Sequence, residues 1–285
     1  MTLIDLQHQL PLVWAPKNHS TNSIGLVFPP RINPLGLYSS LSLEELGPAS
    51  LLDRQETKYI FLEDRMLSLL SGLETEYHVL EINGRQSFDY RSIYFDTPDR
   101  LFYKQHHAGT LPRWKIRQRI YLNSGKSFLE VKHKDNRLVT HKTRQQINHP
   151  IGHISEGGNR FLKSFFPGRI ADLVPVLETR YTRITLVHEN KGERITLDLQ
   201  LRFSDGTCSK SLPNLVVAEI KQNRLNPRSL FISQVKQNGV RPGRFSKYCI
   251  GSLLLNPGLK HNRFKPSLHQ LNSLLEGEKP NEWPL

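Results

Sequence analysis

The sequence is poor in cysteine and in long apolar runs, and it has no sign of an export signal. Its two cysteines, Cys208 and Cys249, show no C-x-x-C spacing, which excludes a disulfide framework and a cysteine zinc site and favours a reducing compartment. No window approaches the roughly 20 apolar residues of a membrane-spanning helix. Residues 1–20 lack the basic and apolar regions of a signal peptide. These absences predict a cytoplasmic protein without a membrane span.

Several common catalytic motifs are also absent. The sequence contains no P-loop, no G-x-G-x-x-G fingerprint, no G-x-S-x-G elbow and no H-E-x-x-H pair, so the folds and hydrolases that use them lose their usual support. Acidic residues are few, because 26 Asp and Glu face 39 Lys and Arg, a net charge of +13. A surplus of this size favours a polyanionic partner: nucleic acid, anionic lipid or a phosphate-rich small molecule.

The 285 residues divide into three parts by pattern. Residues 1–50 carry six prolines and no sustained periodicity, which predicts an irregular lead-in. Residues 51–255 contain dense strand and turn signals and predict the main domain. Residues 256–285 resemble the lead-in and predict an irregular C-terminal tail.

Turn signals and apolar spacing predict the elements of the middle part. Asn83-Gly84, Asn123–Gly125 and Asn190–Gly192 are typical of hairpin turns between antiparallel strands. Helical spacing of apolar residues predicts helices over 62–71, 159–166 and 227–238. The last of these has a proline at its first position and Asn238-Gly239 at its end, as helices often do.

The predicted strands place their charges on one side. Successive side chains of a strand point to opposite faces, so residues 113–120 put a wholly cationic set on one face: Arg113, Lys115, Arg117 and Arg119. Similar polar faces occur in residues 128–134, 181–186, 194–203 and 216–221. Each strand alone could be an ordinary half-buried strand with a solvated face. Like charges side by side repel, however, so the repeated pattern favours strands that close into a barrel around a bound polyanion.

Eight ordered motifs carry a family resemblance. They are Arg54–Tyr59, Ser92–Thr97, Lys115–Arg119, Phe128–Lys132, Tyr181–Arg183, Arg194–Asp198, Ala218–Lys221 and Arg244–Tyr248. Together they resemble the VTC domain, the polyphosphate polymerase domain of the vacuolar transporter chaperone complex, within the triphosphate tunnel metalloenzymes. The resemblance spans roughly residues 50–255. It implies an α+β fold, a closed antiparallel eight-stranded β tunnel with flanking helices.

The resemblance also implies site residues. It places a set of side chains on the phosphates, to which Lys221 is added because it shares the face of Glu219: Lys58, Arg117, Arg119, Lys132, Tyr181, Arg183, Arg194, Lys221, Arg244 and Lys247. Six of them are the predicted catalytic residues: Lys58, Arg117, Arg119, Lys132, Arg183 and Lys247. Glu219 is the implied ligand of a divalent metal ion, Mn²⁺ or Mg²⁺. Glu130 is added as a second metal ligand on chemical grounds, because it shares a strand face with Lys132.

Two departures refine the expectation. Glu56-Thr57-Lys58 stands where tunnel triphosphatases have E-x-E-x-K, which favours the polymerase branch over the hydrolase branch. The sequence lacks the sensing domain and the membrane helices of the eukaryotic family members, so we expect catalysis without translocation.

The resulting hypothesis is an ATP-dependent polyphosphate polymerase that transfers the γ-phosphate of ATP to a growing chain and releases ADP. ATP and polyphosphate are the expected partners, and no nucleic acid is expected. One alternative is a tripolyphosphatase or nucleoside triphosphatase on the same scaffold, in which Glu130 or Glu219 orients a water. Another is a non-catalytic polyanion-binding module, which needs exposed basic and stacking groups.

Overall fold

A computed structural model describes residues 34–46, 55–148, 152–190, 192–224 and 226–275. Residues 1–33 of the predicted lead-in, and the predicted domain start at residue 51, lie outside these residues. Within the described part, the lead-in contributes two short elements, β1 (Ser40–Leu41) and α1 (Leu43–Leu46). None of the described helices has the length and apolar character needed to cross a membrane.

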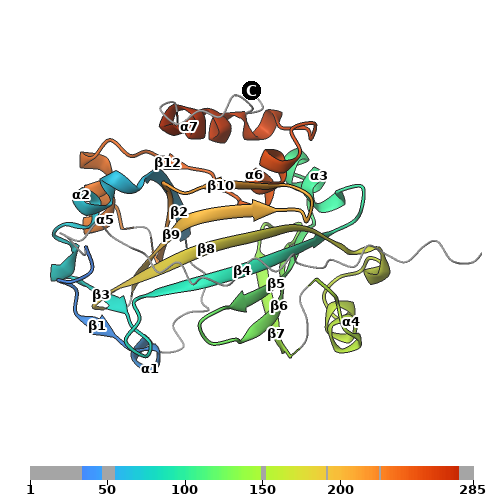
Figure 1. Ribbon diagram of the computed structural model, residues 1–285, viewed down its shortest axis with the longest axis horizontal. Helices are drawn as coiled ribbons and strands as arrows, with labels where there is room; N and C mark the ends of the chain where they lie inside the picture. Colours follow the sequence, from blue (N-terminus) through green and yellow to red (C-terminus); the bar gives the residue numbers. More distant parts are fainter. Residues whose placement is uncertain (1–33, 47–54, 149–151, 191, 225, 276–285) are drawn as a thin grey trace, which may run out of the picture.

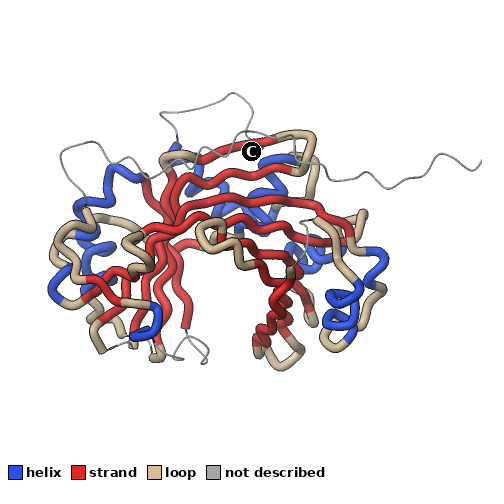
Figure 2. Tube along the Cα trace, turned by 60° about the horizontal axis from the view of Figure 1, so that its bottom comes forward, coloured by secondary structure: helices blue, strands red, loops and turns tan. Residues whose placement is uncertain are grey.

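The fold is a mixed α/β structure built on one large, mostly antiparallel sheet of 12 strands. Its main path joins, in spatial order, β12 (Pro242–Gly243), β2 (Gln55–Leu62), β11 (Leu215–Gln222), β9 (Glu193–Ser204), β8 (Val174–His188), β4 (Ser87–Asp96), β5 (Arg113–Tyr121), β6 (Ser127–Lys134) and β7 (Thr140–Ile147). Of the remaining strands, β3 (Tyr77–Leu80) pairs with β8 and β1, and β10 (Ser209–Leu212) pairs with β9. The sheet bends into an arch whose two ends turn toward the same side (Figures 1 and 2).

The predicted closure of the sheet into an eight-stranded tunnel is wrong, because no ladder between described residues joins β7 to β2. The outer edge of β2 is already occupied. Tyr59 and Lys58 pair there with Pro242 and Gly243 of β12. Among the described residues, a side-chain contact spans the remaining distance to β7, and it is described below.

We call the face of the sheet that carries Arg117, Lys132, Arg183 and Glu219 the inner face, and the opposite one the outer face. Strict alternation holds in β5, where Trp114, Ile116 and Ile120 are buried on the outer side and the cations lie on the inner side. Helices α2 (Met66–Leu70) and α5 (Leu230–Gln237) cover one part of the outer face. α3 (Leu101–Ala108) and α4 (Glu156–Lys163) pack with the outer side of β4, β5 and β6.

The inner face is divided into an apolar half and a charged half. Helices α6 (Lys247–Leu255) and α7 (Lys265–Leu275) pack on the apolar half, where Leu201, Phe203 and Leu253 are buried. Burying one such side chain contributes roughly 2 kcal/mol, so this cluster fixes α6 firmly against the sheet. The start of α6 therefore has a defined position beside the charged half.

The three predicted helices exist with shifted bounds. The 62–71 prediction corresponds to a 3₁₀ turn (Glu63–Arg65) followed by α2. α4 begins three residues before the predicted 159, because the Ser155 side chain accepts a hydrogen bond from the Gly158 amide. α5 begins three residues after the predicted 227, because Ser229 is its N-cap and Asn226 instead accepts a bond from the Arg228 amide. α3 and α6 were not predicted, and the interval predicted to be irregular beyond residue 256 contains α7.

Two of the three hairpin predictions hold, and the hairpin predicted at Asn83-Gly84, between strands over 77–82 and 87–95, is wrong because those strands do not pair. Asn83 and Gly84 both have positive φ angles, as a type I′ turn requires, but the flanking pairing is a single bridge between Ile82 and Arg85. Strand β3 pairs with β8 and β1 and not with β4. Asn123–Gly125 joins β5 to β6 as predicted, and the turn that contains Lys191, which lies outside the described residues, joins β8 to β9.

The predicted alternation over 194–203 fails at its end. A β-bulge places Gln200 and Leu201 opposite Tyr181 alone, and Gln200 has a φ of 52°. An extra residue reverses the faces beyond the bulge. Arg202 therefore pairs with Arg180 on the outer side and is exposed, while Phe203 turns inward against α6.

Candidate functional site

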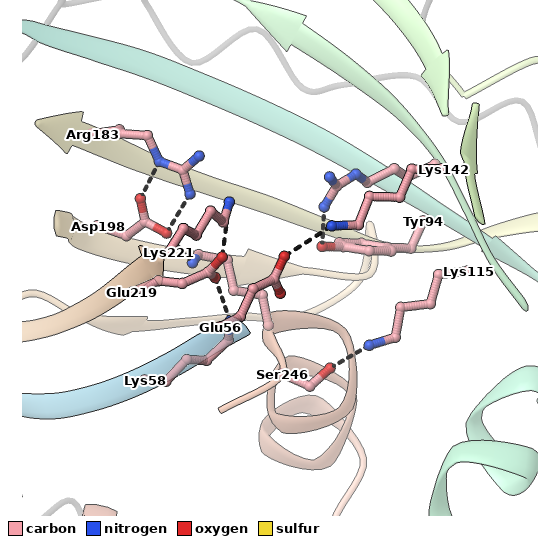
Figure 3. Close-up of polar contacts among 12 residues, drawn as sticks. Glu56, Lys58, Tyr94, Lys115, Lys142, Arg183, Asp198, Glu219, Lys221 and Ser246 are labelled. Carbon is pink, nitrogen blue, oxygen red and sulfur yellow. Dashed lines mark hydrogen bonds and ion pairs between the residues drawn. The ribbon is translucent and has the colours of Figure 1, made fainter. Parts of the chain in front are cut away.

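The strand registers bring most of the predicted site residues onto one surface. Glu219 lies opposite Lys58 on β2 and Thr196 on β9, and Arg183 lies opposite Asp198. On the other limb of the arch, Arg117 lies opposite both Tyr94 on β4 and Glu130 on β6. Figure 3 shows side chains of the two limbs pointing toward one another across the space under the arch. Arg117, Lys132, Arg183 and Glu219 thus share the inner face, around the space under the arch. Because the sheet is not closed and Lys132 is exposed, their expected convergence on one enclosed cavity stays a prediction.

Asp198 on β9 holds two of the predicted cations. Its two oxygens accept bonds of 2.5 and 2.8 Å from Nε and Nη2 of Arg183, and Lys247 at the start of α6 donates to it as well. Burial raises the pKa of Asp198, but the charges of Arg183 and Lys247 outweigh burial and hold it well below its usual range. Asp198 is thus a permanent anion that orients both cations.

Glu219 on β11 is bracketed by two ammonium groups. Lys58 donates to one carboxylate oxygen and Lys221 lies 2.9 Å from the other. Burial opposes ionisation, yet Lys221 and Lys58 lower the pKa of Glu219 well below its usual range. The carboxylate stays charged and faces the space under the arch.

Glu130 on β6 pairs with the predicted clamp on β5. Arg117 donates from Nε to Oε2 of Glu130 at 2.7 Å and from Nη1 to the Tyr94 hydroxyl at 3.1 Å. Arg119 lies farther from the same carboxylate, at 3.8 Å. Burial alone raises the pKa of Glu130, but the two arginines lower it to about 2. The guanidinium of Arg117 is therefore fixed in place, whereas that of Arg119 has a looser partner.

An ion pair bridges the open side of the arch. Nζ of Lys142 on β7 lies 2.8 Å from Oε1 of Glu56 on β2 (Figure 3). We call this contact the seam. Lys132 lies beside it on β6, opposite Lys142 in the ladder. Lys132 is accessible to solvent. Its pKa is lowered to about 8, chiefly by partial burial of the ammonium group. The charges of Lys142 and Lys115 also lower this pKa, whereas the charge of Glu56 raises it.

The start of α6 reaches into the same space. Ser246 caps the helix by accepting a bond from the Cys249 amide, and its hydroxyl also accepts a bond of 3.1 Å from Lys115. Lys247 is the next residue and contacts Asp198. Strand β5 and strand β9 are thus linked through two consecutive residues of one helix N-terminus.

Three predicted residues differ from the rest in their surroundings. Tyr181 is buried, with its ring stacked on Tyr90 and the Lys247 ammonium 4.5 Å from its centroid, so it supports cations rather than lining open space. Arg194 lies at the end of the inner face beside Lys221. Arg244 lies outside the space under the arch. Its side chain is exposed and lines a pocket at one mouth of the arch.

The donor set fits a hard divalent cation. Glu219 and Glu56 face inward from neighbouring strands. Burial and the charge of Glu219 raise the pKa of Glu56, but Lys132, Lys142 and Lys221 outweigh them and lower it. Mg²⁺ in phosphate sites takes one or two carboxylates together with phosphate oxygens, and these two carboxylates meet that need. No cluster of three or more His, Cys, Asp or Glu side chains that could hold a metal occurs in the described ranges. Glu219 has Lys58 and Lys221 as its charged neighbours and Glu130 has Arg117 and Arg119, so the metal roles predicted for both carboxylates stay predictions.

Sequence reasoning missed Asp198, Glu56 and Lys142 as site residues. Asp198 stood on a predicted polar face, and Glu56 stood in the Arg54–Tyr59 motif. Their charge, opposite to that of their neighbours, was the available signal. Lys142 lies on β7, whose sequence, Thr140–Ile147, alternates too weakly to reveal a strand.

Comparison with known proteins adds a family. Residues 53–256 match the family model described as the VTC domain. No curated protein matches this sequence.

Solved structures give weaker likenesses. A proposed adenylate cyclase from Bacillus halodurans is 15% identical, with a TM-score of 0.45, over 68% of this chain and 93% of that one. A proposed adenylyl cyclase from Hippeastrum, described as having a dominant triphosphatase activity, is 15% identical, with a TM-score of 0.43, over 70% and 95%. A third, from Vibrio parahaemolyticus, is 13% identical, with a TM-score of 0.41, over 70% and 99%.

Proposed function

Because this chain belongs to the VTC domain family, we propose that it is an ATP-dependent polyphosphate polymerase. Family membership supports an activity on polyphosphate or triphosphate substrates. The observation that carries the proposal is the inner face, where cations from two limbs of one sheet and from α6 surround a common space. Such a surface neutralises a chain of phosphates along its length.

The reaction joins two anions, and positioning is its main requirement. A terminal phosphate oxygen of the growing chain attacks the γ-phosphorus of ATP. The bond from that phosphorus to the bridging oxygen of the β-phosphate breaks, and ADP leaves with the electron pair. The attacking oxygen is already anionic near neutral pH, so no general base is needed.

The chain's own residues supply the positioning. Arg117 and Arg183 are held by carboxylates in fixed orientations, so their remaining N–H groups are preorganised for phosphate oxygens. Lys58, Lys221 and Lys132 act as point charges around the same space. A divalent cation held by Glu219 and Glu56 supplies further neutralisation of charge on the phosphate oxygens when bound.

The direct test is incubation of the purified protein with ATP and Mn²⁺ or Mg²⁺, with products resolved on a gel and ADP quantified. The proposal expects a ladder of phosphate polymers with matching ADP. Orthophosphate with ADP indicates the triphosphatase alternative, and no turnover indicates a binding module.

Arg117→Lys adds a sharper prediction. The change keeps the charge but loses the fixed planar fork, so we expect ADP release at saturating ATP to fall at least about tenfold, or roughly 1.4 kcal/mol of transition-state stabilisation. The matched control is Arg160→Lys on α4, a helix on the outer side. Equal rates in the Arg117→Lys and wild-type proteins, with unchanged thermal melting, contradict a clamp.

A further inference from the structure

The cations of the molecule fall into two groups by their partners. Inside the arch, the predicted phosphate-binding cations are largely paired: Arg117 with Glu130, Arg183 and Lys247 with Asp198, Lys58 and Lys221 with Glu219. At one mouth the situation is reversed. Arg113, Arg244, Lys260 and Arg263 form no ion pair with a carboxylate anywhere in the part of the chain that the structure describes. We call these four residues the mouth cations.

Two of the mouth cations line a cavity, and the other two act electrostatically on the same neighbourhood. Arg244 and Arg263 line a pocket of about 280 Å³ together with Lys58, Ser246 and Phe264. Burial and the charge of Arg263 lower the pKa of Arg113. Burial followed by Lys260 and Arg263 likewise lowers the pKa of His107. Like charges gathered this closely repel, and no carboxylate within the described ranges forms an ion pair with them.

The pocket is continuous with the inner face. Lys58 and Glu56 line this pocket and also the space under the arch. Glu56 is already paired with Lys142. Ser246, which accepts a bond from Lys115, forms another shared wall. An anionic chain that leaves the space past Lys58 therefore meets Arg244 and Arg263 next.

The surrounding backbone fixes this arrangement. Arg263 donates from Nη1 to the carbonyl of Ala108 at the end of α3 at 3.0 Å. Gly109 follows with a φ of +76°, and a Cβ there would lie 2.1 Å from Arg263. The hydroxyl of Ser267, in the first turn of α7, donates to the backbone carbonyl of Arg244. The guanidinium of Arg263 and the backbone of Arg244 are thus held in place, while neither charge has a carboxylate partner among the described residues.

We propose that the mouth cations and their pocket form a second binding site for the polyphosphate chain, outside the arch. This inference rests on the proposed function. The site holds the segment of chain that lies beyond the reacting end, so that a product stays attached between successive transfers. A short substrate that fits under the arch does not reach it.

A polyphosphate chain fits this pocket better than a nucleic acid does. Non-specific binding of single-stranded nucleic acid uses aromatic faces for base stacking. The two aromatic residues of the lining are occupied, because Phe245 is buried and Phe264 packs against the rings of Tyr103 and His107. The pocket offers charge without a stacking surface.

The test compares binding of long-chain polyphosphate and of tripolyphosphate to the full chain by calorimetry, with no turnover required. The double variant Lys260→Gln/Arg263→Gln should lose at least about tenfold in affinity for the long chain, equivalent to roughly 1.4 kcal/mol. Its affinity for tripolyphosphate should stay within about twofold of wild type, because a short anion does not reach the mouth. With ATP, its polymers should be shorter at an unchanged initial rate of ADP release.

The matched control is Arg228→Gln/Lys236→Gln, which removes the same charge from exposed positions at or beside α5, far from α6 (Figure 1). Equal losses in both double variants show a general charge effect and overturn the proposal, as does an unchanged long-chain affinity. Equal binding of an oligonucleotide, lost in the same variant, also overturns it. Because binding needs no catalysis, a protein that binds long chains at the mouth but makes no polymer contradicts the proposed function alone.

Discussion

At the residue scale, the site depends on carboxylates that orient cations. Asp198 is the clearest case, because its side chain is 4% exposed and it serves both Arg183 and Lys247. Removing one member of a buried ion network leaves the others without compensation. The role of Asp198 is thus to position two groups that face the substrate.

Asp198→Asn tests this role. We expect the free energy of unfolding to fall by about 3 kcal/mol, because two buried cations lose their counter-charge. Tripolyphosphate should raise the melting temperature more in this variant than in wild type, because the bound anion replaces the missing charge. Leu199→Ala on the outer side of the same strand is the control, since it destabilises without touching the cations. An equal ligand-induced shift in both variants contradicts the positioning role.

Lys132 predicts a pH dependence. Its pKa of about 8 in the free protein means that the side chain is positively charged below that pH and becomes a neutral amine above it. A bound polyphosphate favours the charged form, so affinity should be full below pH 8 and fall as pH rises beyond 8. Lys132→Arg keeps its charge over this range and should flatten the decline. The measurement is the dissociation constant of tripolyphosphate from pH 7 to 9.5, and identical profiles for both proteins reject the assignment.

At the element scale, the limb formed by β5, β6 and β7 is the less supported end of the arch. β7 is an edge strand whose residues are mostly exposed, and the seam is the contact that ties it to β2. An exposed ion pair contributes at most about 1 kcal/mol. The seam therefore holds the limb weakly, at a place where a substrate phosphate could take over Lys142.

Lys142→Gln should loosen β7 locally. Amide hydrogen exchange in Thr140–Ile147 should accelerate up to about fivefold, in proportion to a loss of 1 kcal/mol or less. Exchange in β8, β9 and β11 should not change, because these central strands pair on both sides. The comparison variant is Lys104→Gln, which breaks an exposed ion pair with Asp99 outside the sheet. Acceleration throughout the sheet is the result that would sink this description of the seam.

Local rules predicted elements and faces well, and failed where distant contacts decide. Alternation placed Arg117 and Glu219 on the inner face because those strands run without interruption. It misplaced Arg202, because the bulge at Gln200 has no sequence signal as plain as a glycine. It also predicted closure, because it could not show that β12 occupies the edge of β2. The pairings of Asp198 with Lys247 and of Glu56 with Lys142 join segments far apart in the chain.

At the scale of the whole molecule, the +13 net charge coexists with a site that is largely paired by its own carboxylates. Folding therefore does not require the polyanion, since each clamp brings a counter-ion. A substrate must displace or share those carboxylates, which favours an extended chain of many phosphates over a single one. The same carboxylates make the fold sensitive to acid.

Acid stability provides the last prediction. Glu130 has its pKa lowered to about 2, and the pKa of Asp198 and of Glu219 is also depressed. A depressed carboxyl contributes stability above its unfolded pKa, near 4 to 4.5, and loses that contribution as pH falls toward its folded value. The melting temperature should accordingly stay nearly flat from pH 7 to 5 and fall steeply below pH 4.5.

For Glu130 alone the full contribution is about 3 kcal/mol, of which about 2 kcal/mol is lost by pH 3. Glu130→Gln removes the titrating group, so its stability deficit against wild type should shrink by about 2 kcal/mol between pH 7 and pH 3. The measurement is urea unfolding of both proteins at the two pH values, with Glu74→Gln, a half-buried carboxyl of the 3₁₀ turn Leu73–Thr75, as the control. A deficit that stays constant with pH shows that Glu130 acts through packing and not through its charge.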